Sequence, residues 1–160
     1  MARLFRRGTS QSLQKQLFRV LQPRDISAIQ TKEDYDNWIY GTVEQPEWQE
    51  FSRGKIESDR WAYFAKLINI LAYEIISNRE LVSESDWQRL HPFLHLPIDS
   101  YVISNITKIE PGFARIGVLK GMTKVQYRNF QEEARNIAAK HRIQETRLPP
   151  PPIWLEDAFA

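Results

Sequence analysis

Apolar residues recur with the period of an α-helix along most of the chain. Near the N-terminus the apolar stripe consists of Leu13, Leu17, Val20 and Leu21. Because these residues lie at the i, i+4, i+7 and i+8 positions, they predict a helix of about fifteen residues that Pro23 ends.

Two further helices carry a capping signal at their start. Thr31 is followed three residues later by Asp34, and Thr123 is followed in the same way by Gln126. In such a pair the Thr hydroxyl and the later side chain satisfy each other's backbone N–H groups, which fixes where a helix begins. We expect the first of these helices to end before Gly41 and the second to extend through the apolar positions that follow it.

The longest periodic segment covers residues 56–78. Its apolar positions are Trp61, Phe64, Ala65, Ile68, Leu71, Ala72, Ile75 and Ile76. Because the second half of this segment is apolar on nearly every side, it predicts the central and most buried helix of the chain. Lys66 and Asn69 are polar interruptions within it.

The chain changes character after this segment. Ser83 with Asp86 predicts a short capped helix. Pro92 and Pro97 then predict an extended stretch, because each proline disfavours the helical conformation of the residue before it. Asp99 follows at the position of an N-cap, directly before another apolar helical pattern.

Length and composition set the size of the core. The chain has 160 residues, of which 42% are hydrophobic, so it can bury one sizeable core. Together with the helical periods, this predicts a single all-α globular domain over residues 1–160, built around the 56–78 helix. We expect the proline-rich tail at 148–160 to pack back on that domain, because its end is apolar.

Positive charge is concentrated at one end of the chain, although the net charge is only +2. Residues 1–24 contain no acidic side chain, and their basic residues are Arg3, Arg6, Arg7, Lys15, Arg19 and Arg24. A segment of this kind either contacts the phosphates of DNA or RNA or forms a solvated helix face. Arg3, Arg6 and Arg7 are the candidates for phosphate contact.

The sequence lacks the residues or the spacing that several kinds of chemistry require. The chain has no Cys, which excludes disulfides, thiolate metal sites and iron–sulfur ligation and suits a cytoplasmic location. His91, His95 and Asp99 are spaced by four, but the prolines between them prevent the helix that would align them on a metal. With no phosphate-binding loop or dinucleotide motif, we expect no cofactor, no metal and no membrane association.

One combination of motifs resembles a known superfamily. Lys66-x-x-Asn69 lies on the predicted central helix, and Leu-Pro-Ile-Asp-Ser-Tyr-Val-Ile at 96–103 heads the next core helix. This order resembles the helix-hairpin-helix DNA glycosylases of the endonuclease III-like fold, over roughly residues 60–108. The family's Gly-x-Gly before the lysine is replaced by Tyr-Phe-Ala at 63–65, so the hairpin is degenerate.

The resemblance implies roles for individual residues. Lys66 corresponds to the lysine nucleophile of bifunctional glycosylases, and Asp99 to the carboxylate that stabilises the sugar cation or activates the nucleophile. The substrate would be a base flipped out of the duplex and stacked on aromatic side chains. The candidates for binding it are Trp61, Tyr63, Asn69 and Tyr101.

The residues themselves leave other interpretations open. Asp99 is also explained as a structural N-cap, Lys66 as a paired lysine on a large helix, and Asn69 as a core amide that bonds the backbone at 97–98. Three functions follow, in this order. The chain is a nucleic-acid-associated domain of glycosylase-like build without established catalysis, an active DNA glycosylase or lyase that uses Lys66 and Asp99, or a helical protein-interaction module.

Overall fold

The computed structural model describes residues 5–53, 55–56, 60–113 and 119–140. Over these ranges the chain is helical and forms no strand, so the all-α prediction is confirmed. The α-helices are α1 (Ser10–Val20), α2 (Pro23–Ser27), α3 (Lys32–Val43), α4 (Trp48–Phe51), α5 (Trp61–Ser77), α6 (Glu84–Leu90), α7 (Ser100–Ile109) and α8 (Lys124–Lys140), and a 3₁₀ helix, η2 (His91–Phe93), follows α6. The tail predicted to pack at 148–160 lies outside the described residues.

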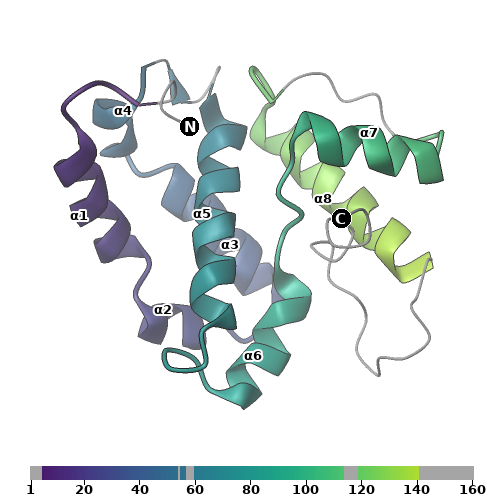
Figure 1. The fold of residues 1–160 in the computed structure, drawn as a ribbon, viewed down its shortest axis with the longest axis horizontal. Coiled ribbons are helices and arrows are strands. Elements are labelled where there is room, and N and C mark those ends of the chain that lie inside the picture. The colour runs from purple at the N-terminus through teal and green to yellow at the C-terminus, as the bar shows by residue number, and fades with distance from the viewer. Residues whose placement is uncertain (1–4, 54, 57–59, 114–118, 141–160) are drawn as a thin grey trace.

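Helix α5 stands at the centre of the molecule, with α1, α2 and α4 on one side and α7 and α8 on the other (Figure 1). Its apolar face is fully buried at Phe64, Ala65, Ile68, Ala72 and Ile76. One cluster of buried apolar side chains extends from Val20 in α1 to Ala138 in α8 and includes this face. The prediction of a central, deeply buried helix is therefore confirmed, and its α-helical part begins at Trp61.

The predicted caps are present where the sequence placed them. The Thr31 hydroxyl accepts from the Asp34 N–H at 3.1 Å, and the Asp34 carboxylate accepts from the Thr31 N–H at 3.0 Å. Asp99 caps α7, because its Oδ1 accepts from the Val102 N–H at 2.8 Å. These side chains satisfy backbone donors that the first turn of a helix leaves free.

Two boundaries differ from the prediction. Helix α3 continues through Gly41 to Val43, whose side chain is fully buried and so extends the apolar face of the helix. Residues 91–93 form η2 and are not extended. Pro92 fits there because the first residues of a helical turn need no N–H donor.

Candidate functional site

The two residues singled out for chemistry are in contact. Lys66 Nζ, on α5, donates a hydrogen bond to Asp99 Oδ2, at the start of α7, over 2.9 Å. The two side chains are 21% and 37% exposed, so the ion pair lies at the surface, where the two helices meet.

Asp99 uses its two carboxylate oxygens for two tasks. Oδ1 caps α7 through Val102, while Oδ2 binds Lys66. Partial burial works to raise the pKa of Asp99, but the hydrogen bonds from the Val102 N–H and Lys66 outweigh it and lower the pKa. The carboxylate that caps α7 thus also binds the Lys66 side chain.

Aromatic side chains accompany the ion pair on both helices. Tyr63 lies three residues before Lys66 on α5, and the Arg60 guanidinium lies 5.6 Å from the centroid of its ring. Tyr101 follows Asp99 by two residues and is 57% exposed. Tyr63 thus shares a helix face with Lys66, and Tyr101 is an exposed ring in the first turn of α7.

The position of Lys66 within its helix differs from the family that the motifs resemble. There the lysine opens a helix behind a glycine loop, whereas here residues 63–65 are already helical and Lys66 lies inside α5. The glycine loop that holds a DNA phosphate in that family has no counterpart before Lys66.

Asn69 binds the segment that leads to Asp99. Its Nδ2 donates to the His95 carbonyl at 2.6 Å, and its Oδ1 accepts from the His95 N–H at 2.9 Å. The Tyr35 hydroxyl donates to the same Oδ1 at 2.9 Å. Because Asn69 is fully buried, it holds the backbone of the core and is not available to a ligand. The bond partner is His95 and not the predicted backbone at 97–98.

Gln131 in α8 holds the next residue in the same way. Its Oε1 accepts from the Leu96 N–H at 2.8 Å, and its Nε2 donates to the Leu96 carbonyl at 2.9 Å. Two buried amides thus satisfy the backbone of a segment that has no strand beside it among the described residues. They fix the path of the chain to Asp99 and so place its carboxylate against Lys66.

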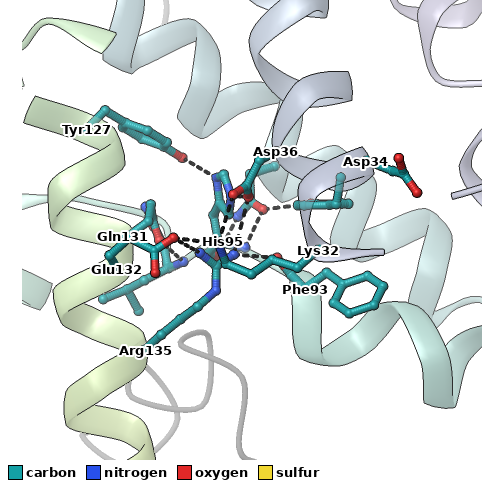
Figure 2. Close-up of polar contacts among 12 residues, drawn as sticks. Lys32, Asp34, Asp36, Phe93, His95, Tyr127, Gln131, Glu132 and Arg135 are labelled. Atoms are coloured by element: carbon teal, nitrogen blue, oxygen red, sulfur yellow. Dashed lines mark hydrogen bonds and ion pairs between the residues drawn. The ribbon is translucent and has the colours of Figure 1, made fainter. Parts of the chain in front are cut away.

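A buried polar cluster surrounds His95 (Figure 2). The His95 Nε2 lies 2.7 Å from Asp36 Oδ1, and its Nδ1 lies 3.2 Å from the Tyr127 hydroxyl. Burial lowers the pKa of His95, although the bond to Asp36 works against this, so the ring is neutral at pH 7. Burial raises the pKa of Tyr127, which therefore keeps its proton. It follows that Nε2–H donates to Asp36 and that Nδ1 accepts from Tyr127.

Charged side chains from α3 and α8 gather around the Asp36 carboxylate that binds this histidine (Figure 2). Lys32 Nζ lies 3.1 Å from Asp36 Oδ2 and also binds Glu132, while Arg135 Nη2 lies 3.5 Å from Asp36 Oδ1. Burial works to raise the pKa of Asp36, but the hydrogen bond from His95 and the charges of Arg135 and Lys32 outweigh it and lower the pKa to about 2. The two carboxylates and two cations balance each other's charge.

This cluster fastens α3, α8 and the segment at 94–98 together. The His95 side chain is 0% exposed, so it cannot touch a substrate. Sequence reasoning considered His95 only as a metal ligand and missed the cluster. The signal that was present is a polar residue within each apolar face, namely Asp36 beside Tyr35 in α3 and Gln131 beside Phe130 in α8.

The basic N-terminal segment is attached to the body of the molecule. The Arg6 backbone N–H and Nε donate to the carbonyls of residues 51 and 52, both over 2.8 Å. Arg6 and Arg7 are both exposed. Arg3, the third arginine predicted to contact phosphates, lies outside the described residues.

Comparison with models of protein families, with curated proteins and with solved structures finds no match to this chain. The resemblance to the glycosylases therefore stays a prediction that depends on the residues quoted for it. In the described part of the chain, no group of three or more His, Cys, Asp or Glu side chains is placed to hold a metal ion. None of the described helices is both long and apolar enough to cross a membrane.

Proposed function

We propose that the chain is a nucleic-acid-binding domain of glycosylase-like build and that its Lys66–Asp99 surface binds without catalysing a reaction. The observation that carries the proposal is the partly exposed ion pair between α5 and α7, with an aromatic residue close by on each helix. Lysine provides charge for phosphates, and tyrosine rings provide surfaces on which unpaired bases stack. This combination favours a single strand over a duplex.

The N-terminal segment carries positive charge and contacts the same helix through Phe5. The Phe5 ring packs edge-on against Phe64 of α5 at 5.7 Å between centroids, which fixes the residues beside it. Arg6 and Arg7 follow directly and are exposed. They are the candidates for additional phosphate contacts.

The proposal is tested by measuring the affinity of a fluorescent single-stranded oligonucleotide by anisotropy over a range of salt concentrations. Tyr101→Ala is expected to weaken binding about tenfold, because one base loses its stacking partner. Phe18→Ala is the matched control, since Phe18 is 69% exposed on α1, on the opposite side of α5 from α7 (Figure 1). The pair Arg6→Gln and Arg7→Gln should reduce the salt slope by about 0.7 for each phosphate that the protein no longer neutralises. Absence of binding at low salt, or equal losses for both aromatic variants, contradicts the proposal.

A second candidate function is a DNA glycosylase or lyase that uses Lys66 as nucleophile. The contact between Lys66 and Asp99 favours it, because a shared reacting centre needs both groups within hydrogen-bond reach. Borohydride traps the covalent adduct that such a lysine forms at an abasic site in a duplex. We expect no adduct, because the glycine loop that would hold the duplex has no counterpart before Lys66. An adduct that Lys66→Gln abolishes would establish the lyase in place of the binding domain.

A further inference from the structure

A pocket of about 450 Å³ lies between α3 and α8, and these two helices provide all the residues that line it. Its volume is within the range of small-ligand sites, which are about 300–1,000 Å³. The pocket shares no lining residue with the Lys66–Asp99 surface. A ligand here would therefore bind at a site separate from the one proposed for nucleic acid.

Two ion pairs connect α3 and α8 around this pocket. Lys32, at the start of α3, binds Glu132 on α8 and also binds Asp36. Lys124, at the start of α8, binds Glu44 just after the end of α3, over 2.7 Å. The two helices thus run in opposite directions past the pocket, and the charges of both lysines are compensated within the protein.

Two other charged residues of the lining have no such partner. No hydrogen bond or ion pair joins Glu33 or Arg128 to any other residue that the structure describes. Both residues are exposed, so a ligand can reach them. Burial raises the pKa of Tyr40, which also lines the pocket, to about 12, and the Arg128 charge works against this rise. The guanidinium therefore lies on the side of α8 that faces α3.

The two unpaired charges have opposite sign and lie about one helical turn apart along the pocket. Arg128 is four residues from Lys124 and four from Glu132, so it lies midway between the two ion pairs. Glu33 adjoins Lys32 and so lies beside one of these pairs. A turn of helix rises about 5.4 Å, a separation that a small molecule with an ammonium group and a carboxylate can span through one hydrogen bond at each end.

We propose that the pocket between α3 and α8 binds a small zwitterion, an α-amino acid with an apolar side chain. Its carboxylate binds Arg128, its ammonium group binds Glu33, and its side chain contacts Val125, which is 66% exposed. An anion or a cation of the same size would pair with one of the two charges and leave the other without a partner. The site is independent of the nucleic-acid-binding surface.

The test uses the full chain and three ligands of similar size. Leucine carries both charges, leucinamide lacks the carboxylate, and N-acetylleucine lacks the ammonium group. In ¹H–¹⁵N NMR titrations we expect leucine to move the backbone amide resonances of Asn37 and Arg128, which both line the pocket, in a saturable manner. Each analogue should bind about two- to fivefold more weakly than leucine, the range of one exposed ion pair.

Two substitutions assign the charges to their partners. Arg128→Gln should remove the preference for leucine over leucinamide, because the carboxylate loses its partner, and should keep the preference over N-acetylleucine. Glu33→Gln should have the reverse effect. Arg53→Gln and Glu74→Gln, at exposed positions outside the pocket, are the matched controls and should keep both preferences. Because Glu33 and Arg128 are exposed, both variants should fold.

Three results would overturn the proposal. The first is an absence of saturable shifts at Asn37 and Arg128 when leucine is added. The second is an equal affinity for leucine and its two analogues. The third is a set of preferences that Arg128→Gln and Glu33→Gln leave unchanged. None of these results bears on binding of the oligonucleotide, because the two sites share no residue.

Discussion

Two aspartates of this protein each bind a cation, and they differ in what surrounds them. The Asp36 side chain is 10% exposed and is surrounded by three side chains, those of His95, Lys32 and Arg135. The Asp99 side chain is 37% exposed and shares its charge between a helix cap and Lys66. The first arrangement is closed and holds the core together. The second lies at the surface and leaves Lys66 partly exposed.

The closed region positions the open one. Asn69 and Gln131 hold the backbone of His95 and Leu96, and the chain then reaches Asp99 three residues later. The surface ion pair therefore depends on buried amides that touch neither of its members. Changes in the two regions are expected to have different consequences, large for stability in the first and large for binding in the second.

The largest loss of stability is expected from Asp36→Ala. This change leaves Lys32, Arg135 and the His95 N–H without their buried acceptor, and breaking a buried ion pair costs about 3–5 kcal/mol of unfolding free energy. Urea denaturation measures the loss. Glu44→Ala is the control, because it removes the carboxylate of a pair with Lys124 that is about half exposed on both sides, and it should cost at most about 1 kcal/mol. Equal losses for the two variants would mean that the buried cluster contributes no more to stability than an exposed ion pair.

Gln131→Leu is expected to have the next largest effect. It leaves the N–H and the carbonyl of Leu96 buried without partners, at about 1–3 kcal/mol for each group. Asn129→Leu, at an exposed position of the same helix, should change the unfolding free energy by less than about 0.5 kcal/mol. The oligonucleotide affinity of Gln131→Leu should also fall, since the path to Asp99 loosens. If the folded Gln131→Leu variant kept its oligonucleotide affinity, the binding surface would not depend on this buried amide.

At Asp99 the alanine and asparagine variants are expected to differ. Asp99→Ala removes the cap and should lower the unfolding free energy by about 0.5–2 kcal/mol, whereas Asn caps a helix about as well as Asp. Asp99→Asn should therefore keep most of the stability while losing the charge that holds Lys66. Thermal and urea unfolding measure both. A loss as large for Asn as for Ala would show that the ion pair, and not the cap, stabilises α7.

The smallest effect is a dependence of stability on pH. The pKa of His95 is lowered by burial, so the unfolded chain binds a proton below about pH 6.5 that the folded protein does not. Stability due to His95 is thus present above pH 6.5 and is lost as the pH falls below it. His95→Gln should flatten this dependence. Stability that rises on acidification would contradict the neutral state assigned to His95.

Asp36 adds a second loss at lower pH. Its pKa of about 2 in the folded protein lies below the ordinary value of 3.8, so its contribution is complete above about pH 4 and disappears as the pH falls toward 2.

Local signals predicted the helices well. Capping pairs such as Thr31 with Asp34 act within one turn, so the sequence contains both partners and their spacing. No local signal determines the contact between Lys66 and Asp99, because the residues are 33 positions apart and their contact depends on the packing of α5 against the segment before α7. The catalytic role that the resemblance attaches to them stays a prediction.

The His95 cluster could not be predicted for the same reason. Its members come from α3, from the segment at 94–98 and from α8, and no single helix pattern shows that Asp36 and Gln131 face the same histidine. A polar residue on an apolar helix face indicates a buried bond but not its partner.

The central claim is that nucleic acid binds at the surface of α5 and α7 and does not reach the buried cluster. The most direct test is a ¹H–¹⁵N NMR titration of the protein with a single-stranded oligonucleotide at low salt. We predict the largest chemical-shift changes at Tyr63, Lys66 and Tyr101, with Asp36 and Tyr127 unaffected. The claim is contradicted by changes that centre on other helices, or by a spectrum that stays unchanged at saturating oligonucleotide.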